Sequence, residues 1–348
     1  MWISGPGPGI GKERKDTLKH RLKFTAGKLA RIFLLLLGVS AVTFLLLCAS
    51  PLDPLQTNVG QTALGSMSQE QIANLQEYWG KNTPPLQRYM GWLLDFLHGD
   101  LGTSLLYRQP VLQVIGQKLS ASFFLLFTSW IISGILGTAL GVVAGTFRRR
   151  WPDRLIRGYC FLISSTPVFW MAVLFLLVFS VWLGWLPVGL SVPIGMEADY
   201  VSMADRIRHA ILPAFTLSIT GVANIALQTR EKTIQVWESD YILFARARGE
   251  TGKAVLGRHV LRNIALPVIT LQFASVSEII GGSVLVEQVF SYPGLGQAAV
   301  TAGLGSDLPL LMGITLLTSA VVFLGNLAAD LLYGLIDPRI RRRIKHAG

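Results

Sequence analysis

Long apolar runs without a charged residue limit what this chain can fold into. Five of them have about the 20 residues that a helix needs to cross the hydrocarbon core of a membrane. They cover residues 32–49, 121–147, 158–185, 210–229 and 308–329. A sixth candidate, residues 264–290, contains Glu278 and Glu287. Because lipid offers the backbone no hydrogen-bond partner, we expect an all-α integral membrane protein with six transmembrane helices.

The composition and the placement of charge agree with this class of protein. Only 15% of the residues are charged, against about 25% in a soluble domain. Of the 31 Lys and Arg residues, 25 lie in residues 12–31, 148–157, 230–262 and 339–345. Cytoplasmic segments are enriched in Lys and Arg, so we expect these segments, and both termini, on the cytoplasmic side. Topology then accounts for the net charge of +11, and no nucleic-acid partner is expected.

The runs divide the chain into segments with different expected roles. Residues 1–28 are predicted to be a mobile cytoplasmic leader, followed by a six-helix domain over residues 29–343. Within that domain, residues 51–118 form an outer loop and residues 230–265 form a cytoplasmic loop. Residues 344–348 form a short tail. The outer loop carries an amphipathic stretch in which Trp92 and Phe96 are expected to lie at an interface.

No pattern of catalytic residues is convincing. The chain has no H-E-x-x-H, no G-x-S-x-G and no phosphate-binding loop. The five histidines lie outside the apolar runs, and Cys48 and Cys160 lie inside them as small hydrophobic residues. We therefore expect no enzymatic activity, no metal site and no cofactor. Active transport by this chain would draw its energy from a partner or from an ion gradient.

Three residues within the runs are candidates for a translocation path. Pro167 should kink or break the third run, because proline has no backbone N–H to donate. Glu278, near the middle of the sixth candidate, faces either a cavity or a hydrogen-bonding neighbour, and the residues alone favour neither. Glu287, at the outer end of the same run, either lines the path or is simply hydrated. Glycines four apart, at 137, 141 and 145, predict close packing against another helix.

A charged, glycine-punctuated stretch lies between two apolar runs on the expected cytoplasmic side. Ser239 or Asp240 can cap a helix over residues 241–248, and Gly249 can end it with a positive φ. A turn and a second helical pattern over residues 253–265 follow. This hairpin either docks on another protein or is a solvated basic loop.

The surface that the hairpin would offer a partner is low in relief. Ala245, Ala247 and Gly249 carry little or no side chain, and Arg246 and Arg248 flank them with positive charge. A surface of this kind can enter a groove. The positive-inside rule accounts equally well for the arginines, so the two interpretations of the hairpin have equal weight.

Five stretches resemble the permease subunits of binding-protein-dependent ABC importers, and more specifically the dipeptide/oligopeptide/nickel permease family. They are GDLGTSLLYRQPV (99–111), STPVFW (165–170), ARARGETGKAVLGRHVLRNIALPVIT (245–270), IGGSVLVEQVFSYPGLG (280–296) and LIDPRIRR (335–342). The third is similar to the EAA loop of these permeases. The resemblance extends over about residues 29–343 in matching order.

This resemblance implies a type I ABC importer permease in the bacterial cytoplasmic (inner) membrane. Such a subunit pairs with a second homologous permease, two cytoplasmic ATP-binding subunits and an extracytoplasmic substrate-binding protein. The hairpin would be the coupling helix, with ATPase-coupling residues Tyr241, Phe244, Ala245, Arg246, Ala247, Arg248, Gly249 and Glu250. Phe244 departs from the general pattern, which has Ala there, and the leader is longer than usual.

The cargo that the family implies is a dipeptide or an oligopeptide. Nickel or a metal chelate is the alternative cargo. An ion-coupled carrier working alone usually shows inverted repeats, which this sequence lacks. A membrane enzyme would need the catalytic set that is missing.

Overall fold

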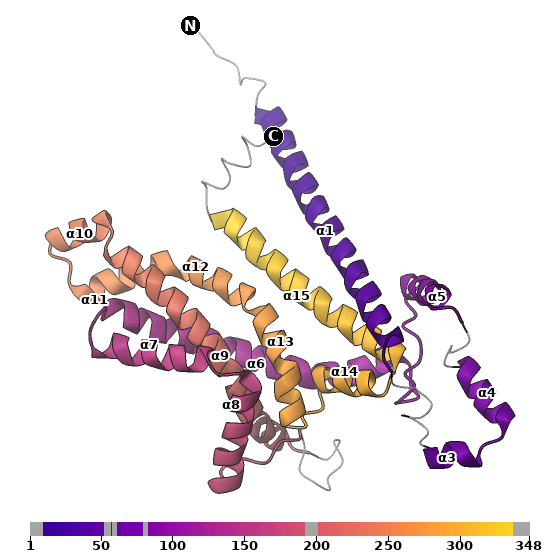
Figure 1. Ribbon diagram of the computed structural model, residues 1–348. Coiled ribbons are helices and arrows are strands. Elements are labelled where there is room, and N and C mark those ends of the chain that lie inside the picture. The colour runs from indigo at the N-terminus through magenta and orange to yellow at the C-terminus, as the bar shows by residue number, and fades with distance from the viewer. Residues whose placement is uncertain (1–9, 52–56, 58–60, 79–82, 192–200, 337–348) are drawn as a thin grey trace.

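The computed structural model describes residues 10–51, 57, 61–78, 83–191 and 201–336. The described residues form helices and loops without a strand, apart from a single bridge between Thr103 and Pro110. The helices are α1 (Ile10–Cys48), α3 (Gln61–Ser66), α4 (Gln69–Tyr78), α5 (Pro85–Leu97), α6 (Val111–Thr146), α7 (Trp151–Ser164), α8 (Val168–Phe175), η1 (Leu176–Trp182), α9 (Met203–Trp237), α10 (Asp240–Ala247), α11 (Gly252–Val255), η3 (Leu256–Val260), α12 (Leu261–Ala274), α13 (Val276–Val289), α14 (Leu295–Leu304) and α15 (Leu308–Ile336). Figure 1 shows α10 and α11 at one end of the molecule and α3, α4 and α5 at the other.

The expected all-α membrane fold is confirmed. Within the described residues, five helices are long and apolar enough to cross a membrane, and a bent helix pair makes a sixth if it counts as one span. The five are Gly27–Cys48, Val111–Thr146, Met203–Trp237, Gly252–Ala274 and Leu308–Leu332. The protein is therefore a multi-pass membrane protein.

The third apolar run breaks at Pro167, as the sequence predicts, and the break is sharper than a kink. The chain bends by 104° between helix α7 and the α8–η1 segment. Proline cannot donate to the preceding turn, so carbonyl groups there need other partners. Ser165 Oγ donates to the Phe161 carbonyl and Thr166 Oγ1 donates to the Leu162 carbonyl, both at 2.8 Å.

The sixth candidate run, residues 264–290, does not form one helix. It splits at Ser275 into α12 and α13, and Figure 1 shows the chain changing direction there. The apolar stretch long enough to span is Gly252–Ala274, which begins in the charged, glycine-punctuated hairpin. The expected boundaries of this span are therefore wrong, because hydropathy reports an apolar run and not the bend within it.

Helix α1 begins at Ile10, so residues 10–28 continue the first apolar helix instead of forming a separate segment. The first residues of the expected leader, 1–9, and the tail, 344–348, lie outside the described residues. Lys28 Nζ forms an ion pair with Asp330 Oδ2 at 2.6 Å. This ion pair joins α1 to the C-terminal part of α15. Figure 1 shows α1 and α15 side by side.

The central contact of the bundle is between α6 and α9, the most extensive helix pair. A Cβ atom on Gly141 would lie 2.6 Å from the Ala226 carbonyl oxygen, and one on Gly145 would lie 2.5 Å from Thr233 Cβ. These distances are shorter than van der Waals contact, so only glycine allows the two backbones to approach this closely. The expected packing role of the glycine series is confirmed.

A buried carboxylate holds the outer loop against the start of α15. Asp307 Oδ2 accepts hydrogen bonds from Ser104 Oγ at 2.5 Å and from the Leu106 backbone N–H at 3.0 Å. Its other oxygen accepts from the Leu310 N–H at 3.2 Å, which satisfies a free donor at the helix N-terminus. The segment GDLGTSLLYRQPV is thereby fixed to a distant helix, since Ser104 and Asp307 are 203 residues apart in the sequence.

The amphipathic outer stretch forms α5, but its aromatic residues do not face outward. Trp92 is buried, and Phe96 stacks on it with ring centroids 5.4 Å apart. Both belong to a cluster with Phe44 of α1 and Met312 of α15. The expectation that Trp92 and Phe96 lie at an external interface is wrong, because these rings pack against protein.

The glycine contact gives the first test. Gly141→Ala should lower stability by about 1–3 kcal/mol, because the added methyl group overlaps α9. Gly116→Ala, on the same helix, should be neutral or slightly stabilising, because no atom lies within 4 Å of the place its methyl group would take. Thermal unfolding of the detergent-solubilised protein measures both. Equal melting temperatures for the two variants would contradict this account of the packing.

A charged hairpin and a polar hollow

Helix α10 and the turn after it form as the local sequence predicts. The helix covers Asp240–Ala247, and Gly249 follows with φ +85°. This left-handed conformation is accessible to glycine at little cost and ends the helix. Ser239 occupies the N-cap position, but its hydroxyl donates to the Val236 carbonyl and does not cap the helix. Thr251 caps α11 by accepting from the Ala254 N–H at 3.4 Å.

Apolar side chains pack the hairpin onto the helical bundle. Ile242 of α10 and Val255 of α11 are fully buried in one cluster with Val142 of α6 and Val260 and Ile264 further along the chain. The hairpin is therefore continuous with the packed bundle. A change at its tip can be transmitted to α6 and α12 through these contacts.

Ala245 belongs to this buried side of α10 and not to the exposed surface. The expected low-relief surface is therefore wrong at Ala245, which faces inward three residues after Ile242. Ala247 and Gly249 are exposed, as expected. At the helical period of 3.6, residues three apart share one face, so Ile242 and Ala245 point the same way.

The exposed side of α10 carries large apolar side chains. Leu243 is 70% exposed and Phe244 is 63% exposed, with Tyr241 beside them. Sequence reasoning missed Leu243, although its position next to Phe244 places it on the outer face once Ile242 points inward. Exposed apolar side chains on a helix at the water side of a membrane protein are a signal for a contact with another protein.

Charged residues surround this apolar surface. The Arg246 guanidinium lies 4.9 Å from the centroid of the Trp237 ring, and Arg248 lies 5.8 Å from that of Phe244. Glu250 Oε2 lies 3.1 Å from His259 Nε2 across the hairpin. The arginines are thus held along the rim by aromatic rings, and the hairpin presents an apolar centre with a basic edge.

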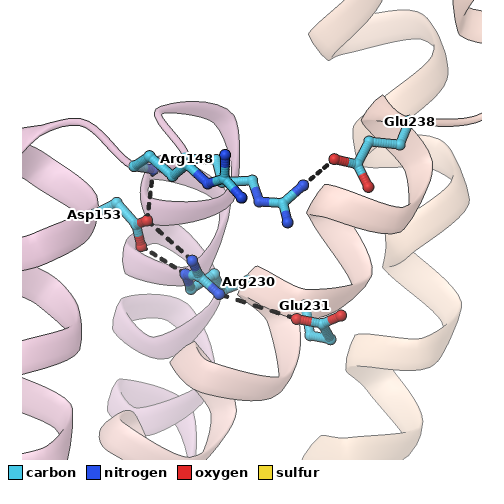
Figure 2. A network of polar contacts seen from close by, with 6 residues as sticks. Arg148, Asp153, Arg230, Glu231 and Glu238 are labelled. Atoms are coloured by element: carbon cyan, nitrogen blue, oxygen red, sulfur yellow. Dashed lines mark hydrogen bonds and ion pairs between the residues drawn. The ribbon is translucent and has the colours of Figure 1, made fainter.

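A network of ion pairs fixes the base of the hairpin, and Figure 2 shows it. Asp153 of α7 is 1% exposed and accepts two hydrogen bonds from Arg230 of α9, at 2.6 and 2.9 Å. Asp153 also accepts from the Arg149 backbone N–H at 2.8 Å, at a residue with φ +64°. Arg148 pairs with Glu238 on the surface, where both side chains are well exposed. The α6–α7 turn is therefore held to the end of α9.

A polar hollow lies where α7, α8, α9 and α13 meet, beside the break at Pro167. Its volume is about 380 Å³. It is lined by Ile163, Ser164, Thr166, Val168, Thr220, Asn224, Leu227 and Glu278. The structure thus brings Glu278 together with the two residues that flank Pro167. Neither the spacing of these residues nor the hydropathy of the sequence predicts that they lie together.

Glu278 is exposed to this hollow and is held in place by an amide. Asn224 Nδ2 donates to Glu278 Oε2 at 2.9 Å, and Gln228 Nε2 donates to Asn224 Oδ1 at 2.9 Å. The two alternatives for Glu278 are therefore not exclusive, since it both bonds a neighbouring helix and faces a cavity. Asn224 and Gln228 were missed by sequence reasoning, which looked for charged residues inside the runs.

Glu287 has a different environment and does not line the hollow. It is 0% exposed, and it accepts from Ser122 Oγ at 2.7 Å and from the Gln297 N–H at 3.1 Å. The Ser122 hydroxyl in turn accepts from the Leu295 N–H at 2.7 Å. Glu287 therefore caps the N-terminus of α14. The expectation that Glu287 is hydrated is wrong, because its side chain is fully buried, and a place on a translocation path stays a prediction for this residue.

No group of three or more His, Cys, Asp or Glu residues that could hold a metal ion occurs in the part of the chain that the structure describes. A second, more open hollow of about 720 Å³ lies beside the hairpin. It is lined by Gly257, Arg258, His259, Arg262 and Asn263. Its two arginines lie in the chain on either side of His259, which contacts Glu250 of the hairpin.

Known proteins are similar to this chain in sequence. Residues 137–342 match the family described as binding-protein-dependent transport system inner membrane component. The oligopeptide transport system permease protein AppB of Bacillus subtilis is 36% identical over 307 residues, covering 88% of this chain and 95% of that protein. The dipeptide transport system permease protein DppB of Alkalihalophilus pseudofirmus is 32% identical over 335 residues, with 92% and 99% covered. A putative peptide transport system permease of Brucella abortus is 35% identical over 318 residues, with 90% and 97% covered.

The network in Figure 2 provides a matched pair of variants. Arg230→Gln should destabilise the protein by about 3–5 kcal/mol, because it leaves the buried Asp153 carboxylate without its cation. Arg148→Gln removes only an exposed pair with Glu238 and should cost less than about 1 kcal/mol. Thermal melting in detergent compares the two. A loss for Arg148→Gln as large as that for Arg230→Gln would show that burial does not decide the strength of these pairs.

Proposed function

The chain belongs to the family of binding-protein-dependent transport system inner membrane components, and we propose that it is the membrane-spanning permease subunit of an ABC importer for peptides. The observation that carries this is the family match, which contains both the cytoplasmic hairpin and the polar hollow. The three relatives compared above are named as oligopeptide, dipeptide and peptide permeases. Dipeptides or oligopeptides are therefore the cargo.

The alternatives have less support. None of those three relatives is named as a nickel or metal permease, and the described residues contain no cluster suited to a bare metal ion. An ion-coupled carrier working alone does not agree with membership in a family that depends on a binding protein. The sequence has no nucleotide-binding loop, so we propose that the chain itself is not an enzyme.

The partners that this function requires are those of a complete importer. We propose a second homologous permease, two cytoplasmic ATP-binding subunits and an extracytoplasmic substrate-binding protein. The assembly would lie in the bacterial cytoplasmic membrane with both termini inside. The family description supports the membrane, and the 25 of 31 positive residues in the expected cytoplasmic segments support the orientation.

Helix α10 is the proposed contact with the ATP-binding subunits. Its outer face combines exposed Leu243 and Phe244 with a basic edge, and a helix of this kind fits an apolar groove with an acidic rim. The opposite face is packed into the bundle through Ile242 and Ala245. A movement of the ATP-binding subunit would therefore reach α6 and α12 through rigid packing and not through a loose loop.

The polar hollow beside Pro167 is the proposed position of the translocation path. Peptides carry many hydrogen-bonding groups, and a path for them needs polar partners within the apolar bundle. Glu278, Asn224 and Thr220 supply such partners from two helices, next to the bend between α7 and α8. The backbone break matters because non-helical backbone at membrane depth occurs where it lines a cavity or is buried in protein.

Coupling through the hairpin is tested at Gly249. Gly249→Val should leave insertion intact but weaken co-purification of the ATP-binding subunits and reduce peptide uptake by roughly tenfold or more. The reason is that a β-branched residue cannot hold φ +85° without strain that moves the tip of α10. Gly249→Asn is the matched control, because Asn tolerates this conformation, and it should retain most activity.

The charge at the rim gives an independent check of the same contact. Arg246→Glu should weaken co-purification of the ATP-binding subunits more at low salt than at high salt, if an acidic surface faces it. If docking and uptake are normal in both Gly249→Val and Arg246→Glu, the hairpin is a solvated basic loop and not a contact with the ATP-binding subunits.

The role of the hollow is tested at Glu278. Glu278→Gln keeps the shape and one hydrogen-bonding partner for Asn224 but removes the charge, and uptake of a peptide should fall roughly three- to tenfold. Glu278→Leu also removes the hydrogen bond and should be worse. Glu70→Gln, on the exposed surface of α4, should behave as the unmodified protein. Normal uptake by both Glu278 variants, at normal assembly, would exclude this residue from the path.

A further inference from the structure

Helix α5 in the outer loop presents three faces with different chemistry. One face packs on protein through Tyr89, Trp92 and Phe96. A second face is apolar and is left exposed by the residues that the structure describes. This stripe consists of Leu86 (75% exposed), Met90 (48%), Leu94 (54%) and Leu97 (61%). The third face carries Gln87, Gly91 and Asp95, all exposed.

The order of these faces around the helix follows from their spacing. Residues four apart in an α-helix fall nearly above one another, so Leu86, Met90 and Leu94 form one stripe along the axis. Gln87, Gly91 and Asp95 are each one residue later, which turns them by about 100°. The apolar stripe therefore lies between the face that packs on protein and the polar face.

The position of α5 along the axis of α1 is given by its contacts with that helix. Tyr89 lies with its hydroxyl oxygen 2.8 Å from Ser40 Oγ and its ring centroid 5.2 Å from that of Phe44. Both residues lie within the apolar stretch Gly27–Cys48. At a rise of about 1.5 Å per residue, Ser40 is about 12 Å before Cys48 along the axis. Helix α5 therefore lies level with the last turns of the apolar stretch and not beyond its end.

The apolar stripe of α5 also continues an existing lipid-facing surface. Only 11% of the most apolar window in Gly27–Cys48 is buried, and Val42, Leu45 and Leu46 near its end are exposed. In a multi-pass protein, such a surface faces acyl chains. Figure 1 shows α5 beside this end of α1 and the start of α15.

We propose that α5 is an interfacial helix that lies in the membrane, with the Leu86–Met90–Leu94–Leu97 stripe in the acyl-chain region and Gln87 and Asp95 toward the headgroups and water. Its partner is the lipid surface, not a second protein. This arrangement has the form of an amphipathic anchor, with one additional face fixed to the bundle. This proposal goes beyond the proposed transport function. The proposed topology would place α5 in the extracytoplasmic leaflet, and only that placement rests on it.

The anchor has a consequence for the loop that contains it. Helices α3 and α4 precede α5, and the Asp307-bound segment follows it. The aromatic cluster would hold α5 to the bundle, and the apolar stripe would hold it to the lipid. The outer loop would then have a fixed depth relative to both the bundle and the bilayer. Such an anchor would give a fixed position to the surface on which an extracytoplasmic substrate-binding protein docks.

Nitroxide labels on single cysteines test the proposal in the assembled permease. The background replaces the two native cysteines, as Cys48→Ser and Cys160→Ala. Labels at Met90 and Leu94 probe the stripe, and labels at Gln87 and Asp95 serve as controls on the same helix. The complex is reconstituted in vesicles of phosphatidylethanolamine and phosphatidylglycerol. The measurement is the collision rate of each label with apolar oxygen and with a water-soluble nickel chelate.

At Met90 and Leu94, collisions with oxygen should exceed those with the nickel chelate several-fold, and the ratio should invert at Gln87 and Asp95. Low collision rates with both reagents at Met90 and Leu94 would show that a second protein covers the stripe. A higher rate with the nickel chelate there would place the stripe in water. Either result would overturn the proposal. If a labelled variant fails to assemble, Leu97 supplies another position on the same stripe.

Discussion

The close approach of α6 and α9 is the contact on which the other features of this protein depend. Glycines at 141 and 145 allow the two backbones to approach closely. The two ends of this helix pair then contact different parts of the protein. At the end near the hairpin, Arg230 of α9 holds Asp153 beside the α6–α7 turn. At the other end of α6, Ser122 joins Glu287 to the start of α14. A tightly packed pair can transmit force between these ends, because interdigitated backbones at contact distance leave little space for relative motion.

The carboxylates of the described bundle divide into structural and exposed groups. Asp153, Glu287 and Asp307 are buried, and each accepts at least two hydrogen bonds from groups that would otherwise lack a partner. Glu278 differs, because its partner is the side-chain amide of Asn224 and it opens onto a polar hollow. A carboxylate inside an apolar bundle is costly unless it is paired or hydrated, so the lighter pairing of Glu278 is the feature that sets it apart. This contrast, and not the presence of charge alone, supports the place that we propose for Glu278 in the path of the imported peptide.

Local signals in the sequence predict local structure well. Gly249 ends α10 with a positive φ and Pro167 interrupts its helix, both as expected, because both effects depend on the residue's own backbone chemistry. The exposed position expected for Ala245, the external position expected for Trp92 and the hydration expected for Glu287 are wrong. Each of these depends on what lies opposite: the cluster under Ile242, the aromatic side chains near Phe44, and the hydroxyl of Ser122. The spacing and hydropathy of the residues in one segment do not show which residue from a distant segment will contact them.

Hydropathy and motifs alone establish the class of this protein, its number of apolar spans to within one, and the family to which its hairpin and loop motifs belong. Hydropathy suffices for the first two because the bilayer requires a minimum apolar length of every spanning helix. Three features emerge only from the packed helices: the run over residues 264–290 bends at Ser275, Glu278 meets Asn224 beside Pro167, and α5 turns its aromatic rings inward and its leucines outward. Helix direction and side-chain partners are set by packing between segments far apart in the chain, and that information does not exist within any single segment.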